Sequence, residues 1–153
     1  MITLLQKLFR IMRPCRMPQK AVSLLESEGL LVLQEKIRIV VIFKNFKAPY
    51  RRHSYKSSIA FGSFGLSSRR IMAFSFFKMI VHTTYDEPKF KSITFSNRKD
   101  KYLSLSFDAS EFHQNQSGQI EIRFFLSNVN EAIHILQGFG ASILDVVKET
   151  TEK

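Results

Sequence analysis

The chain has a single cysteine, Cys15, and no tryptophan among its 153 residues. One cysteine cannot form an intrachain disulfide or a multi-cysteine metal cage, and it is consistent with a reducing compartment. No apolar run approaches the roughly 20 residues that cross a bilayer, because even the dense stretch 37–43 is interrupted by Arg38. We therefore expect a cytoplasmic protein, either free or peripheral on the inner face of a membrane.

Acidic residues are also scarce, with 13 Asp and Glu against 23 Lys and Arg, which gives a formal net charge of +10. Two stretches, 1–25 and 36–85, hold 15 of the 23 basic residues and no acid. An asymmetry of this kind predicts an anionic partner, which could be a phospholipid surface, a nucleic acid or an acidic protein. A purely solubilising surface is the alternative interpretation.

The residue types that carry catalysis or bind metals form no constellation in the sequence. The four histidines lack the spacing of metal ligands; they are His53, His82, His113 and His134. Gly62 and Gly65 are not followed by a predicted helix, so they do not indicate a phosphate-cradling loop. The sequence therefore predicts no enzyme activity, no cofactor and no metal site.

The N-terminal segment, residues 1–17, has a character of its own. Residues 2–13 form a short basic amphipathic pattern that could be a helix, and Pro14 and Pro18 would end that helix. Such a segment is typical of a membrane-interface helix or a targeting peptide. It could equally be a start-site extension, since Met17 would make a natural alternative start just before the predicted domain.

Beyond that segment the periodicity predicts a small domain rich in strands. Residues 19–28 read as a helix between Pro18 and Gly29. A closing helix follows Asn128, which precedes Glu131 by three positions as in a capping box. The strands expected between the two helices cover 30–44, two segments of 57–77, 79–85, 90–95, 102–107 and 120–126.

These predicted helices and strands define the fold class as mainly β (α+β). We expect a strongly bent antiparallel sheet or roll of about seven strands, with a short N-terminal helix and a C-terminal amphipathic helix that closes the open end. The predicted domain covers 18–139. Residues 140–153 are expected to be a helical extension or a tail.

One segment resembles a known family of folds. Residues 62–75, GSFGLSSRRIMAFS, resemble the hairpin that in GRAM and bacterial PH domains reads Gly-x-Leu/Ile-x-Leu-Thr-x-x-Arg-Leu-Ile. Ser67 stands where Thr is usual, and Arg70 matches the arginine. Together with 79–93 and 118–137, this makes the chain similar to the pleckstrin-homology-like (PH-like) superfold. The resemblance implies an anion-binding loop between the first two strands.

The best functional candidate lies in that position, where 45–57 is predicted to be a loop or a ragged strand edge. The candidate ligand-binding cations are Lys44, Lys47, Arg51, Arg52 and Lys56. The aromatic side chains available to insert into a membrane or stack are Phe46, Tyr50 and Tyr55.

From this loop we predict a non-enzymatic PH-like module that docks on an anionic membrane surface or an acidic partner protein. A nucleic-acid-binding β domain that uses the same basic and aromatic face is one alternative. A scaffold for protein interaction or homo-oligomerisation is the other. In that alternative an apolar groove beside the closing helix would take a peptide or a second copy of the chain.

Overall fold

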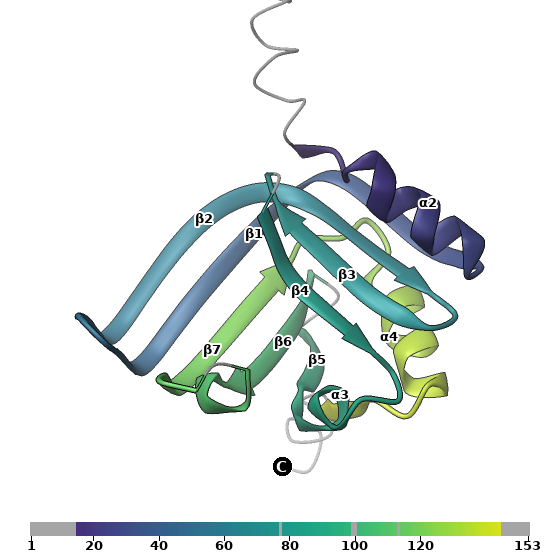
Figure 1. The fold of residues 1–153 in the computed structure, drawn as a ribbon. Helices are drawn as coiled ribbons and strands as arrows, with labels where there is room; N and C mark the ends of the chain where they lie inside the picture. Colours follow the sequence, from purple (N-terminus) through teal and green to yellow (C-terminus); the bar gives the residue numbers. More distant parts are fainter. Residues whose placement is uncertain (1–14, 77, 99–100, 113, 145–153) are drawn as a thin grey trace, which may run out of the picture. The chain divides into compact units, whose positions relative to one another are not determined.

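The computed structural model describes residues 15–76, 78–98, 101–112 and 114–144 (Figure 1). The predicted N-terminal amphipathic pattern at 2–13 therefore lies outside the described residues. In chain order the elements are α2 (Gln19–Ser27), β1 (Leu30–Ala48), β2 (Arg51–Ser67), β3 (Arg70–Ser75), β4 (Lys78–Thr84), α3 (Pro88–Ser92), β5 (Thr94–Arg98), β6 (Tyr102–Asp108), a 3₁₀ turn (Ala109–Glu111), β7 (Ser117–Phe124), α4 (Val129–Gly138) and β8 (Ser142–Leu144).

The described chain is mainly β, as the sequence predicted. The strands hydrogen-bond in the order β4-β3-β2-β1-β7-β6-β5-β8, so the sheet is open at β4 and β8. It has eight strands where about seven were expected, and it is mixed because β8 pairs parallel with β5. No helix within the described residues is long and apolar enough to cross a membrane.

The chain divides into two compact units, and β1 and β2 each contribute residues to both. The first unit takes in residues up to Arg38 together with Ala60–Thr83. In it, α2 packs Ala21 and Leu25 into a cluster with Met72 and Phe74 of β3. Gly65 of β2 lies beneath this helix, and a Cβ there would stand 2.6 Å from Leu25 Cδ1. Glycine at this position therefore lets α2 approach the sheet closely.

The turn between β2 and β3 in this unit is held by side-chain hydrogen bonds. The Ser67 hydroxyl accepts from the backbone N–H groups of Arg69 and Arg70, at 3.1 Å each. The Arg70 guanidinium donates to the half-buried Glu28 carboxylate from Nε and Nη2, and its Nη1 lies 3.0 Å from His82 Nε2. Ser67 and Arg70, on which the resemblance to PH-like hairpins rested, thus have a structural role in joining this turn to the end of α2.

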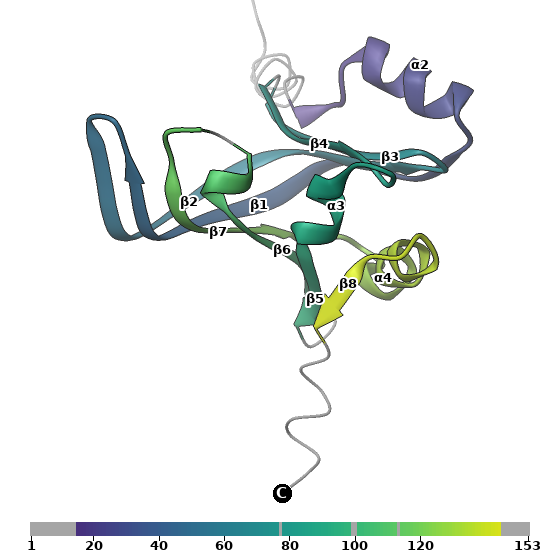
Figure 2. The same cartoon turned by 60° about the horizontal axis from the view of Figure 1, so that its bottom comes forward.

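The second unit takes in Ile39–Ile59 and the residues from Thr84 onward. Its ladders β1–β7, β7–β6 and β6–β5 are antiparallel. Helix α4 packs beside β5, β6 and β8, and it buries Val129, Ala132 and Leu136 (Figure 2). The predicted cap is confirmed, since Asn128 Oδ1 accepts from the Glu131 backbone N–H at 3.1 Å.

Two segments of this unit differ from the sequence predictions. The strand expected over 90–95 is replaced by α3, with Pro88 in its first turn, and β5 begins only at Thr94. The aromatic ring of Phe90 packs edge-on against Tyr85, with ring centroids 5.0 Å apart, so its burial depends on tertiary packing rather than on a strand pattern. At the other end, residues 142–144 form β8 rather than a helical extension, after Gly140 adopts φ 87°.

Candidate functional site

The predicted cation-rich loop is for the most part a β-hairpin (Figure 1). Strand β1 continues to Ala48 and β2 begins at Arg51, so only Pro49 and Tyr50 connect them. Proline fixes a negative φ, and Tyr50 adopts φ 68°, which is the combination that a type II turn places at its two central positions. The polar composition of 45–57 predicted a loop or a ragged strand edge. Because the turn is only two residues long, β1 and β2 instead continue almost up to it.

A bulge in β1 sets the direction of the hairpin's outer part, which we call the hairpin tip and define as residues 47–56. The register with β7 shifts between Lys44, opposite Gln119, and Lys47, opposite Ser117. Asn45 takes up the extra residue with φ 51°. Gly118 lies against this bulge, because a Cβ on it would stand 2.3 Å from the Asn45 carbonyl oxygen.

The five predicted cations do not share one electrostatic environment. Lys47, Arg51, Arg52 and Lys56 are exposed at the hairpin tip, and none of them forms an ion pair within the described part of the chain. Lys44 differs, since its Nζ lies 3.5 Å from Glu121 Oε1. The hairpin tip therefore presents four cations, and Lys44 belongs to an ion cluster on the sheet.

That cluster is centred on the buried carboxylate of Glu121. It accepts hydrogen bonds from Arg123 Nε and from the Ser104 hydroxyl, each at 2.8 Å. Burial acts to raise the pKa of Glu121, but the hydrogen bonds from Arg123 and Ser104 and the charges of Arg123 and Lys44 outweigh it, so the pKa is lowered. Lys44 is thereby held against the sheet by a carboxylate that stays ionised.

The three predicted aromatic side chains also separate into two groups. Tyr50 is fully exposed at the turn and Tyr55 is mostly exposed, as insertion or stacking requires. Phe46 is only 4% exposed and packs against Phe43, with ring centroids 4.9 Å apart, and against His53, at 6.2 Å and nearly parallel. Its assignment as an inserting or stacking residue is corrected, because the bulge at Asn45 turns it into the packed side of the hairpin.

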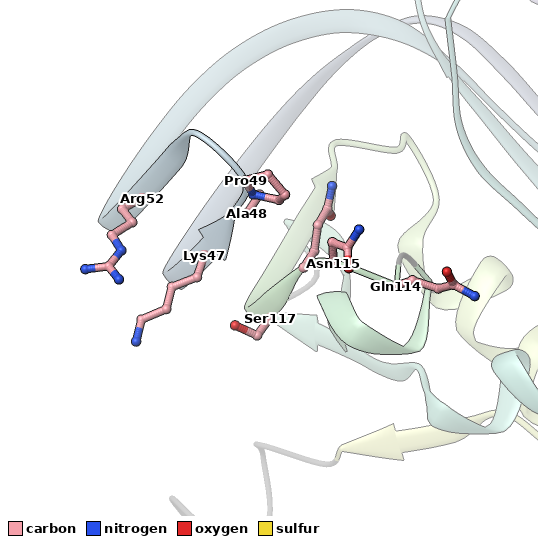
Figure 3. A pocket seen from close by; sticks show the side chains of 8 residues that line it. Lys47, Ala48, Pro49, Arg52, Gln114, Asn115 and Ser117 are labelled. Atoms are coloured by element: carbon pink, nitrogen blue, oxygen red, sulfur yellow. The ribbon is translucent and has the colours of Figure 1, made fainter.

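Sequence reasoning missed the polar segment that faces the hairpin tip. An open depression of about 430 Å³ lies between the two (Figure 3). Lys47 and Arg52 line it from neighbouring strands, and the Ser117 hydroxyl turns toward the side of Lys47, whereas Gln114 points away. The lining residues are Lys47, Ala48, Pro49, Arg52, Gln114, Asn115, Gln116 and Ser117.

The described lining residues offer cationic and neutral hydrogen-bond donors and include no carboxylate, which suits an anion rather than a metal ion. The only sequence signal for this side of the depression is the polar run before Gly118, which is equally typical of an ordinary turn. Within the described residues, no group of three or more His, Cys, Asp or Glu side chains could hold a metal ion.

Comparison with known proteins gives no independent assignment for this site. No protein-family model matches the chain, and no curated protein matches it either. The interpretation of the site therefore depends on its own geometry, which combines four exposed cations that form no ion pair with another described residue, an exposed tyrosine at a tight turn and a depression lined with hydrogen-bond donors.

Proposed function

We propose that this protein is a non-enzymatic, PH-like binding module that docks on an anionic membrane surface through the hairpin tip. One observation carries the proposal: Tyr50 stands fully exposed at the end of a tight turn, with Lys47, Arg51, Arg52 and Lys56 on the strands beside it. A membrane interface accommodates a tyrosine ring at the level of the headgroups.

The PH-like part of the proposal is supported by the antiparallel ladders of the second unit and by α4, which packs beside β5 and β6. In this proposal α4 is the helix that closes the open end of a bent sheet. Strand β8 is an addition to that plan, since it follows α4 and pairs parallel with β5. The hairpin tip then occupies the place of the first inter-strand loop of the superfold.

The energetics of the hairpin tip fit reversible surface binding. Each Lys or Arg close to an anionic bilayer contributes about 1 kcal/mol, so the four cations of the hairpin tip supply about 4 kcal/mol before any gain from Tyr50. Their attraction is screened over about 8 Å at physiological ionic strength, so binding must weaken as salt is raised. The donors around the depression, such as Asn115 and Ser117, would orient one headgroup phosphate without requiring a deep pocket.

The test is co-sedimentation with phosphatidylcholine vesicles that contain or lack phosphatidylserine. The double variant Arg51→Ala/Arg52→Ala should bind the anionic vesicles about thirtyfold more weakly, which corresponds to the loss of about 2 kcal/mol. The matched control is Lys20→Ala/Arg69→Ala, which removes two exposed cations outside the hairpin and leaves the same net charge. It should retain most of the binding.

Two results would contradict the proposal. Equal binding to anionic and neutral vesicles at low salt would exclude an electrostatic membrane contact. Equal losses in the two double variants would show that total charge matters and that the hairpin tip does not. Binding of an oligonucleotide at physiological ionic strength, in the absence of vesicle binding, would favour the nucleic-acid alternative, with Tyr50 and Tyr55 as its stacking residues.

A further inference from the structure

Ser54 lies in the middle of the hairpin tip, with cations on both sides of it along β2. It is exposed, and no other described residue forms a hydrogen bond with its hydroxyl. Side chains alternate between the two faces of a strand, so Arg52, Ser54 and Lys56 share one face, with about 7 Å between successive members. His53 faces the other way, since its ring stacks on Phe46. The Ser54 hydroxyl is therefore accessible and lies between two cations.

The segment that carries Ser54 is also open along its outer edge. Strand β3 pairs with β2 only over Gly62–Leu66, so no described strand pairs with the outer edge of β2 over residues 51–58. These residues form an extended segment that another protein can reach from that side. A modifying enzyme needs such a segment, because it has to bring the reacting hydroxyl into its own active site.

The residues before Ser54 form a charge pattern that suits a kinase with an acidic substrate cleft. Arg51 and Arg52 stand three and two positions before the serine. Guanidinium groups pair bidentately with carboxylates, so two arginines at fixed positions align the hydroxyl that follows them. The other pair of consecutive arginines, 69–70, has Met72 in the corresponding position. Ser54 is therefore the only serine or threonine of the sequence that follows an arginine pair at this spacing.

We infer that Ser54 is a phosphorylation site of a serine kinase and that its phosphate releases the hairpin tip from anionic membranes, an inference that rests on the proposed function. In the transfer the Ser54 Oγ attacks the γ-phosphorus of ATP, the bond to the bridging oxygen breaks, ADP leaves, and the hydroxyl proton passes to the base of the kinase. Phosphoserine carries a charge of about −1.5 to −2 at pH 7, so it offsets about two of the four cations. Its oxygens accept hydrogen bonds from Arg52 and Lys56, which are then no longer available to lipid phosphates.

The test treats the full chain with MgATP and a purified kinase that selects arginine two and three positions before serine. Mass spectrometry should find one phosphate, at Ser54. The variant Ser54→Ala should take up none and should bind vesicles that contain phosphatidylserine like the wild-type chain, whereas Ser57→Ala should be phosphorylated normally. The phosphorylated wild-type chain should bind those vesicles about thirtyfold more weakly, because about two charges are offset.

Two charge variants separate the position of the phosphate from its charge. Ser54→Glu adds one negative charge at the hairpin tip and should weaken vesicle binding about fivefold. Ser23→Glu adds the same charge at an exposed position of α2 and should weaken binding by less than about twofold.

The outcomes also distinguish this inference from the proposed function. The inference is overturned if the kinase leaves Ser54 unmodified, if the phosphorylated chain binds the anionic vesicles as before, or if the two glutamate variants lose binding equally. If the unmodified chain does not bind anionic vesicles at all, the proposed function fails, and the release by phosphate fails with it.

Discussion

Gly118 offers the sharpest test of how the hairpin tip is positioned. Its φ of 102° lies in the region that favours glycine, and the space for a Cβ is occupied by backbone atoms of the β1 bulge. An added Cβ would stand 2.3 Å from the Asn45 carbonyl oxygen and 2.8 Å from the Phe46 Cα. Backbone cannot move aside as a flexible side chain can, so Gly118→Ala must displace β1 from β7.

The cost of Gly118→Ala has two parts. An L-residue with a left-handed φ costs about 1–2 kcal/mol. Forcing an extra methyl group into a packed site costs about 1–3 kcal/mol more. We therefore expect the free energy of unfolding to fall by about 2–5 kcal/mol, which lowers the Tm by about 4–20 °C in a chain of this length. The control is Gly138→Ala at the end of α4, where a Cβ meets nothing within 4 Å.

Urea unfolding followed by circular dichroism compares the two variants with the wild-type chain. Gly138→Ala should leave the stability unchanged or raise it by up to about 1 kcal/mol, because alanine is the better helix former. Amide hydrogen exchange should show that Gly118→Ala loosens residues 44–48 more than the rest of β1. The reasoning is refuted if Gly118→Ala costs less than about 1 kcal/mol, since the backbone contact would then not exist.

Two further predictions concern the same unit. Tyr50→Gly should raise the free energy of unfolding by about 1 kcal/mol, because glycine accepts the φ of 68° without strain, and it should weaken vesicle binding. A loss of stability would show that the turn does not need a positive φ. The pKa of Glu121 is lowered from its ordinary 4.5, so the stability that its ionised form contributes is present above that value and is lost as the pH falls through the folded-state pKa. The free energies of unfolding of the wild-type chain and of Glu121→Gln should therefore converge at low pH, and a constant difference between the two pH curves would contradict the assignment.

Local sequence rules predicted the elements whose cause is local. The α4 cap depends on Asn128 and Glu131, three positions apart, and the turn after Ser67 depends on a hydroxyl within hydrogen-bond reach of the next backbone N–H groups. Strand β6 follows a simple alternation of apolar and polar residues. In each case the information lies within a few residues, so the sequence was sufficient.

The misassigned segments have causes that lie far away in the sequence. The stretch at 45–57 looked like a loop because it is polar and contains Pro49, but the pairing of β1 with β7 extends the strand to Lys47. Phe46 looked available because its neighbours are charged, whereas the bulge at Asn45 determines which way it faces. Strand β8 depends on a partner in β5, about fifty residues earlier, which no local pattern of three residues could indicate.

The same distinction applies to charge. The stretch from 36 to 85 contains no acid, and its cations looked uniformly unneutralised. In the folded chain at least two of them are paired with carboxylates from outside the stretch: Arg70 with Glu28, and Lys44 with Glu121. A run of basic residues in the sequence therefore overstates the positive electrostatic potential that a binding partner encounters at the surface. The cations at the hairpin tip differ because the tight turn projects them beyond Glu121, the carboxylate that pairs with Lys44. For this reason they, rather than the total charge, should set the salt dependence of binding.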